Sequence, residues 1–320
     1  MMHKPYGIIT ALLLAGSLAA ATFPIRIVPM ETQIPFGDKG FVAVLGDPQA
    51  PPGPRRSLTV YRPDGKFAYE VSPRMPSGDD INLRAAAVDS DGTAVVSIFD
   101  NPGGPPGSAG LVIVRDGGQT QQFIDTGTYV AESISIAADH TIWTLGNLRR
   151  GPNTPVTPGF RMVHHYTADG KPAGEYLPAN TFPPLKAWRA WTPPLSPLRQ
   201  GQVIAGGEIG VSMIAASADR VGVYYAPMQA WLELDFSGHL LGRWTLPLPV
   251  WHLAFTQDGS LFSNLNAPLR LRRFDRASTS WRLLLAEFPS QMLIGTDGGK
   301  LMLGSAVADT FEVEEFEPPH

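Results

Sequence analysis

Short apolar runs alternate with tight polar turns along most of this chain, and the alternation predicts β-hairpins. In one clear instance the apolar residues 85–88 are followed by Asp89-Ser90-Asp91-Gly92 and then by a second apolar run, residues 93–99. Such runs are shorter than a typical helix, and an Asp-Gly pair supplies the backbone geometry that a tight hairpin turn requires. The pattern therefore indicates an all-β chain.

The strand–turn–strand unit is an internal repeat. Its turn is found at Gly40, Gly92, His140, Arg220, Gly259 and Gly298. A second turn follows in all units but the last, at Asp64-Gly65, Asp116-Gly117, Asp169-Gly170, Ser237-Gly238 and Arg276-Ala277. Both series have a period of roughly 40–50 residues once an insertion at residues 181–208 is set aside. Each unit therefore contains two hairpins and four strands.

Four-stranded units of this length are typical of β-propeller blades, and the repeats predict a six-bladed β-propeller. The last unit is incomplete, because only two strands, at residues 300–304 and 310–316, follow Gly298. An apolar stretch at residues 23–29 belongs to no unit. We expect this N-terminal strand to complete the last blade and close the ring, which removes an exposed sheet edge. An open β-sandwich of several hairpins is the alternative, which the recurrence of the turns disfavours.

The repeated segments are similar to NHL-type propeller repeats. The similarity lies in Ala86-Ala87-Val88-Asp89-Ser90-Asp91-Gly92 and in Leu111-Val112-Ile113-Val114-Arg115-Asp116-Gly117-Gly118. It extends over nearly all of residues 22–320 and implies a six-bladed propeller. The NHL-like family includes ligand-binding modules, scaffolds, lyases and hydrolases, so the resemblance selects no activity.

Residues 1–21 have the features of a secretory signal peptide. Lys4 precedes an apolar stretch at residues 8–18, and Ala19-Ala20-Ala21 supplies the small residues that a signal peptidase reads. We expect cleavage after Ala21, which leaves a soluble periplasmic or extracellular protein with one domain, residues 22–320. An uncleaved membrane anchor is the alternative, but the apolar stretch is shorter than the roughly 20 residues that span a bilayer.

Composition excludes several classes of function. A formal net charge of -4 argues against a protein that binds nucleic acid by neutralising phosphates. The absence of cysteine removes disulfides, thiolate metal ligands and cysteine nucleophiles. The chain lacks a nucleotide-binding glycine fingerprint, a Gly-x-Ser-x-Gly elbow and a His-Glu-x-x-His motif. We therefore predict no cofactor and no metal site.

Some acidic and histidine residues have simpler interpretations than a site. Residues 89–92 begin like a calcium loop but lack its distal glutamate, so we interpret them as a turn. His164 and His165 are neighbours on a strand, so their side chains point to opposite faces and cannot chelate one ion. His140 and His239 fall at turn tips, where we expect them to be solvated.

The candidate binding residues fall near one end of the predicted innermost strands, on the face that carries the long loops. Loops on a rigid scaffold are where binding is usually found. The predicted strand ends carry Arg84, Glu132, Glu208, His252 and Gln291. They come from five different blades, so they are expected to converge at the mouth of the axial channel and to bind a polar ligand. The alternative is a rim of solvated, mutually paired charges.

The insertion at residues 181–208 supplies a second candidate. It carries Lys186, Trp188, Arg189 and Trp191 among several prolines. Two indole rings flanked by two cations suit stacking on a ring or holding an anion. The alternative is that both tryptophans fold inward as an apolar plug.

The sequence thus predicts an exported propeller that acts as a ligand-binding or protein-interaction module. Its partner is a polar small molecule or a protein, with no nucleic acid and no stable membrane insertion, and we expect a monomer. The alternative is a propeller enzyme, a lactonase-like hydrolase or a lyase. Such enzymes need carboxylates and asparagines around an axial metal, for which Glu132, Glu208 and Asn264 are the candidates.

Overall fold

The computed structural model describes residues 22–26, 34–46, 56–76, 81–100, 107–148, 159–178, 212–247, 250, 252–265, 270–285, 292–307 and 310–319. Regular structure in these ranges consists of β-strands and two three-residue 3₁₀ turns, at Asp116–Gly118 and Ala226–Met228. Within them, no helix has the length and apolar character needed to cross a bilayer. The predicted all-β class is confirmed.

Four sheets each contain four consecutive strands in antiparallel order. The first comprises β6 (Ile81–Val88), β7 (Ala94–Asp100), β8 (Ala109–Arg115) and β9 (Thr120–Gly127). The second comprises β10 (Tyr129–Ile136), β11 (Ile142–Leu148), β12 (Arg161–Tyr166) and β13 (Pro172–Pro178). The third comprises β14 (Met213–Ala216), β15 (Val221–Tyr225), β16 (Ala230–Leu234) and β17 (Leu240–Thr245). The fourth comprises β18 (His252–Phe255), β19 (Leu261–Leu265), β20 (Arg270–Asp275) and β21 (Ser280–Leu285).

A fifth sheet has eight strands and contains both ends of the described chain. Its N-terminal strands are β1 (Thr22–Arg26), β2 (Ile34–Asp38), β3 (Phe41–Gly46), β4 (Ser57–Tyr61) and β5 (Phe67–Val71). Its C-terminal strands are β22 (Met292–Asp297), β23 (Lys300–Val307) and β24 (Thr310–Phe316). The order across the sheet is β1-β24-β23-β22-β2-β3-β4-β5.

Two pairings join the ends of the chain within this sheet. β1 lies antiparallel to β24, with Thr22 opposite Glu314 and Arg26 opposite Thr310. β2 and β22 pair in parallel over a short stretch in which Gly37 lies opposite Gly295. A Cβ atom on Gly295 would lie only 1.7 Å from the carbonyl oxygen of Gly37. This contact between the two strands therefore requires glycine.

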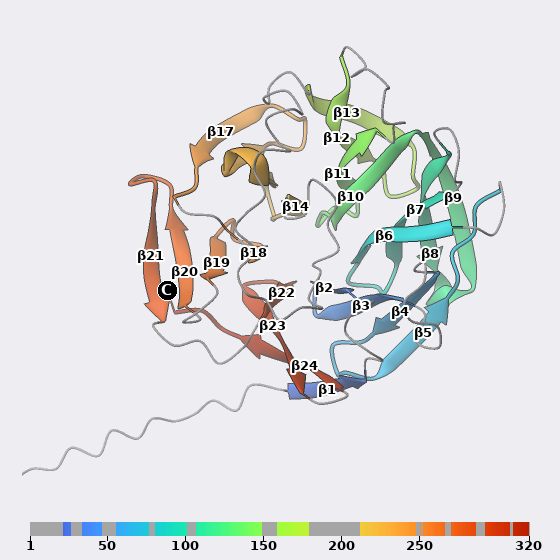
Figure 1. Ribbon diagram of the computed structural model, residues 1–320, viewed down its shortest axis with the longest axis horizontal. Coiled ribbons are helices and arrows are strands. Elements are labelled where there is room, and N and C mark those ends of the chain that lie inside the picture. Colours follow the sequence, from blue (N-terminus) through green and yellow to red (C-terminus); the bar gives the residue numbers. More distant parts are fainter. Residues whose placement is uncertain are drawn as a thin grey trace, which may run out of the picture.

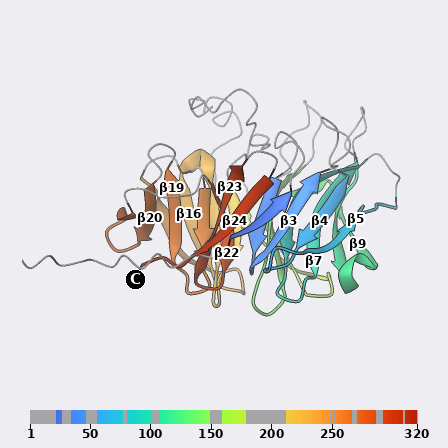
Figure 2. The same ribbon diagram turned by 90° about the horizontal axis from the view of Figure 1, so that it is seen from below.

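The sheets are arranged in a ring (Figure 1), with β2, β6, β10, β14, β18 and β22 nearest its centre. In the perpendicular view, strands of neighbouring sheets stand side by side around the ring (Figure 2). Radially arranged four-stranded antiparallel sheets are the architecture of a β-propeller.

The core lies between neighbouring sheets, because each strand sends alternate side chains to opposite faces. On β6, Ala86 belongs to an apolar cluster shared with Leu58 of β4, whereas the next residue, Ala87, belongs to a cluster shared with Ile134 of β10. Trp143 and Trp231 are fully buried in such clusters, so these tryptophans pack between sheets.

The two predicted series of turns connect the strands at the expected positions. The turn from β6 to β7 closes through a hydrogen bond from the Gly92 amide to the Asp89 carbonyl, and the Asp91 carboxylate accepts from the Thr93 amide. The interpretation of this segment as a turn is confirmed. Gly92 has φ 84°, a left-handed backbone that favours glycine, and His140 adopts φ 67° in the same position of the turn from β10 to β11.

Candidate functional site

Arg84 and Glu132 are the predicted mouth residues whose side chains the structure describes. His252 is described by its backbone, as the first residue of β18, opposite Asn264 of β19. Glu208 and Gln291 lie outside the described residues, as do Lys186, Trp188, Arg189 and Trp191 of the insertion. The structure therefore describes the side chains of only two of the five residues that were expected to converge at the mouth of the channel.

Arg84 and Glu132 lie on neighbouring innermost strands, β6 and β10. Each is the fourth residue of an eight-residue strand, so the pair lies midway along these strands rather than at their ends. The Arg84 Nε donates to Glu132 Oε2 across the gap between the two sheets. The side chains retain 21% and 17% exposure, so neither is sealed from solvent.

Both residues occupy irregularities of the β-ladder. In the ladder between β6 and β7, Leu83 pairs with Ile98 and Ala86 pairs with Val96. Arg84 and Ala85 therefore lie opposite the single residue Ser97. On β10 the register passes from Ala131 to Ser133, and Glu132 is the extra residue. A β-bulge inserts one residue into a strand and redirects its side chain. The two bulges therefore explain how charged groups are accommodated on strands that are otherwise packed in the core.

The bulge at Glu132 depends on a glycine in the neighbouring strand. Gly146 of β11 pairs with Ala131, directly before the extra residue. A Cβ atom at position 146 would lie 2.2 Å from the carbonyl oxygen of Val130. Any larger residue at 146 would force the irregular backbone apart, so Gly146 contributes to the placement of Glu132.

The ion pair leaves polar atoms available on both partners. An arginine has five N–H donors, and a carboxylate has two acceptor oxygens. Within the described ranges, Nη1 and Nη2 of Arg84 and Oε1 of Glu132 make no hydrogen bond. The hydroxyl of Ser97, on the stretch of β7 that faces the Arg84 bulge, is fully buried and also has no partner there.

Asn264 is a further buried polar group near the expected mouth. Its side chain is fully buried, and neither its amide nitrogen nor its oxygen has a hydrogen-bond partner within the described residues. It pairs across the strand with His252 and with Leu271. An unsatisfied buried amide is costly, which makes Asn264 a position where a water or ligand group would be stabilising.

A second charged cluster, which the sequence analysis missed, lies on the short turns between the first and second strands of three sheets. Lys39 Nζ lies 2.5 Å from Asp89 Oδ1, and His140 Nδ1 lies 2.5 Å from Asp89 Oδ2. Lys39 also donates to the carbonyl oxygen of Ala137. The expectation that His140 is simply solvated is incomplete, because one of its nitrogens is bound to Asp89. The sequence carries no signal for this contact, because the left-handed backbone of His140 and the neighbouring turn that carries Asp89 are known only from the structure.

The electrostatics of this cluster follow from burial and hydrogen bonding. Burial opposes ionisation of Asp89, but hydrogen bonds from Lys39 and His140 outweigh it and hold the pKa of Asp89 below its usual value. The hydrogen bond to Asp89 raises the pKa of His140. Burial raises the pKa of nearby Asp38 to about 7, against the attraction of Lys39 and with support from Asp89 and Asp297.

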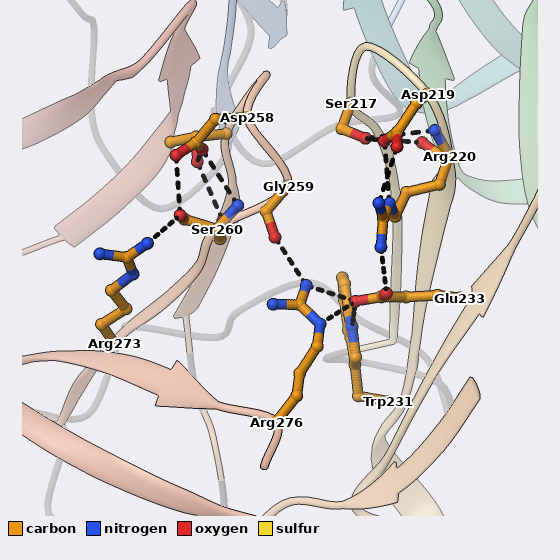
Figure 3. A network of polar contacts seen from close by, with 11 residues as sticks. Ser217, Asp219, Arg220, Trp231, Glu233, Asp258, Gly259, Ser260, Arg273 and Arg276 are labelled. Atoms are coloured by element: carbon orange, nitrogen blue, oxygen red, sulfur yellow. Dashed lines mark hydrogen bonds and ion pairs between the residues drawn. The ribbon is translucent and has the colours of Figure 1, made fainter. Parts of the chain in front are cut away.

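A third polar network links the β14–β17 sheet to the β18–β21 sheet (Figure 3). The Glu233 side chain is 1% exposed and accepts from Trp231 Nε1 at 2.8 Å, from Arg276 Nε at 2.8 Å and from Arg220 Nη1 at 3.2 Å. Arg276 also donates to the carbonyl oxygen of Gly259 at 2.6 Å. Every oxygen of this carboxylate is satisfied by protein donors, so we assign the network a structural role.

The adjacent histidines have separate surroundings, as predicted. His164 stacks on Tyr129 with ring centroids 3.7 Å apart, and His165 stacks on Trp143 at 4.0 Å. Burial lowers the pKa of both histidines. Among the residues whose positions the structure gives, no three histidine or acidic side chains are grouped so that they could hold a metal ion.

Comparison with known proteins identifies no family and no activity for the chain. No family model matches the chain, and no curated protein sequence matches it. Virginiamycin B lyase from Staphylococcus aureus has a similar structure at 12% identity, over 92% of this chain and 99% of that chain, with a TM-score of 0.45. Regucalcin, a calcium-binding protein from Agrobacterium tumefaciens, is similar at 13% identity over 93% and 96% of the chains, with a TM-score of 0.49. A luciferin-regenerating enzyme is similar at 10% identity over 92% and 95%, with a TM-score of 0.49.

These structural relatives are β-propeller proteins. Their identities and TM-scores are too low to transfer any residue, ligand or activity to this chain. Membership of the NHL family in particular is not shown, because no family model matches.

Proposed function

We propose that this protein is an exported β-propeller that binds a polar ligand or a protein partner near its axis and on its long-loop face. The observation that supports this most is the pair formed by Arg84 and Glu132. The pair is held by bulges on two innermost strands, remains partly exposed, and has hydrogen-bonding atoms that no other described residue engages. A purely structural ion pair, such as that of Glu233, has its acceptor atoms satisfied by the protein.

We further infer a ring of six blades. In this interpretation the eight-stranded sheet comprises two blades that touch through β2 and β22, and β1 serves as the fourth strand of the last blade. The parallel pairing of β2 with β22 and the antiparallel pairing of β1 with β24 support this division. The ring is thereby closed by strands from both ends of residues 22–320, the single domain that we expect after signal-peptide cleavage.

The alternative, an enzyme with an axial metal, gains no support from the described residues. Glu132 was one of the proposed carboxylate ligands, but Arg84 already binds it. The positive charge of Arg84 would repel a cation at the same place.

The binding role is tested by ligand capture from culture filtrate of the native host. Purified protein is dialysed against the filtrate, and retained small molecules and proteins are identified by mass spectrometry. Arg84→Gln is expected to lose a species that the parent retains, at a temperature at which melting curves show both proteins to be folded, because the variant leaves the mostly buried Glu132 without its partner and should be less stable. If the parent and the variant retain the same species, the axial pair is not a binding site.

The insertion is tested separately through Trp188→Ala combined with Trp191→Ala. Large aromatic residues on a proline-stiffened loop lose little entropy on binding, and we expect the double variant to lose about 2 kcal/mol or more in affinity. The melting temperature should change little. A large loss of thermal stability without loss of binding would instead identify the tryptophans as an apolar plug.

A further inference from the structure

We propose that Arg84 and Glu132 together recognise a carboxylate that carries an N–H donor on its adjoining carbon. This chemistry is shared by a free α-amino acid and by the C-terminal residue of a peptide. The inference rests on the proposed binding function and specifies the ligand class.

The arginine selects the carboxylate. Its Nε is occupied by Glu132, whereas Nη1 and Nη2 have no partner within the described residues. These two groups form a planar fork that matches the two oxygens of a carboxylate. A lysine in this place would offer a point charge without that geometry.

The glutamate selects what lies beside the carboxylate. Oε2 of Glu132 accepts from Arg84, and Oε1 has no partner within the described residues. Because the two side chains are in contact, a donor bound at Oε1 must lie close to the carboxylate bound by Arg84. An N–H on the adjoining carbon meets this requirement. A phosphate does not, because the charge of Glu132 would repel its additional negative charge.

The pair is pre-organised for such a ligand. Both side chains are about four-fifths buried, so their rotamers are restricted before binding and little further entropy is lost. The β-bulges fix the backbone on both sides of the gap.

The test is equilibrium dialysis with three probe sets. One is a library of N-acetylated tripeptides with free C-terminal carboxylates, the second is the same library with amidated C-termini, and the third is the set of free amino acids. The parent protein should retain members of the first or third set at least about tenfold more strongly than the amides. Retention of peptides or of amino acids distinguishes the two sources of the same chemistry.

Variants separate recognition from folding. Arg84→Gln and Arg84→Lys should each weaken retention about tenfold or more, the second because the fork is lost while the charge remains. Glu132→Gln should weaken retention of free amino acids more than that of acetylated peptides, because an ammonium is the more strongly attracted donor. Arg115→Lys is the matched control on β8, where Arg115 binds Gln122 and the Ala168 carbonyl. It should leave retention unchanged.

The outcomes distinguish this inference from the proposed function. If free carboxylates and amides are retained equally, or if Arg84→Lys retains peptides like the parent, the inference is wrong. The proposed function then still stands if the culture filtrate contains a species whose retention requires Arg84. If no species requires Arg84, the inference and the axial part of the proposed function are both wrong, and only binding through the insertion remains to be judged by the tryptophan variants.

Discussion

Asp38 and Asp89 are carboxylates at the same end of the ring, and their surroundings give them opposite properties. Asp89 binds two cations, Lys39 and His140, through separate oxygens, which keeps it ionised. Burial shifts the pKa of Asp38 upwards to about 7, so this group takes up a proton near neutrality. A carboxylate whose pKa is raised in the folded state makes the free energy of unfolding depend on pH, because the unfolded chain loses the same proton at much lower pH.

We predict that the protein is less stable at pH 8 than at pH 5. The folded state holds a proton on Asp38 up to about pH 7, whereas the unfolded state releases it near 3.8, so stability falls as the pH rises through this window. The raised pKa of His140 acts in the same direction, since its stabilising charge is lost as the pH rises above 6.5. The lowered pKa values of the partly buried His164 and His165 act in the opposite direction, because these groups take up protons more readily in the unfolded chain. The free energy of unfolding in urea should therefore decrease between pH 5 and 8 by less than the contribution of Asp38 alone, which is about 2 kcal/mol.

Asp38→Asn isolates the contribution of this carboxyl. The amide resembles the protonated acid. The free energy of unfolding of the variant should therefore fall much less between pH 5 and 8 than that of the parent, and the variant should be the more stable protein at pH 8. Asp64→Asn is the control, because Asp64 is an exposed turn residue with a lowered pKa and no expected titration in this window. An Asp38→Asn variant with the same pH dependence as the parent would show that Asp38 does not carry the effect.

At the scale of the element, neighbouring sheets are joined by polar contacts as well as by apolar packing. The Glu233 network spans β16, the turn before β15 and two turns of the next sheet. Its carboxylate is fully buried, whereas Arg220 and Arg276 retain about a third of their side-chain exposure. Loss of the carboxylate would therefore leave two cations beside a desolvated site without a counter-charge.

We predict that Glu233→Gln destabilises the protein by about 3 kcal/mol, because breaking one partner of a buried ion pair leaves the other uncompensated. Urea unfolding followed by tryptophan fluorescence measures the loss. Asp169→Asn is the control, since it removes the ion pair between the exposed side chains of Asp169 and Lys171 and should cost less than about 1 kcal/mol. Equal losses in the two variants would contradict the assignment of Glu233 as a clamp between sheets.

The sequence predicted the elements that local chemistry determines. Asp-Gly turns and apolar runs located the hairpins, because turn geometry and side-chain alternation depend on adjacent residues. The sequence analysis brought Arg84 and Glu132 together, either around a ligand or as mutually paired charges, but it placed them at the ends of their strands. Their position midway along β6 and β10 was not predicted, since it depends on two bulges. The binding of Asp89 by Lys39 and His140 was missed for a similar reason. This contact joins turns of three different sheets, and the sequence around each turn does not determine how the sheets are oriented relative to one another.

The strand β1 is expected to stabilise the sheet by covering one of its edges. It covers the edge of β24, whose residues Phe311 and Val313 are buried. We predict that deletion of residues 22–30 lowers the melting temperature by about 5 °C or more, because a sheet edge and part of the apolar core become exposed. Deletion of residues 2–21 alone should leave the melting temperature within about 2 °C of the parent. If the two deletions have the same effect, β1 does not close the ring.

At the scale of the whole molecule, the first and last strands of the described residues, β1 and β24, pair in one sheet. β1 begins at Thr22, the first residue after the expected cleavage site, and its pairing with β24 begins there, opposite Glu314. Signal-peptide processing and ring closure therefore concern adjacent residues. Cleavage after Ala21 preserves the whole of β1, whereas cleavage beyond Arg26 would remove it.

We accordingly predict that the mature protein in its native host begins at Thr22 and is recovered in the soluble periplasmic or extracellular fraction. The apolar stretch ends in Ala19-Ala20-Ala21, which suits a signal peptidase, and the register of β1 tolerates no cleavage far downstream. Intact-mass measurement of protein from each cell fraction determines the N-terminus. A mature chain that begins after Arg26 would contradict closure of the ring by β1, and a membrane-bound chain that retains residues 1–21 would contradict export as a soluble protein.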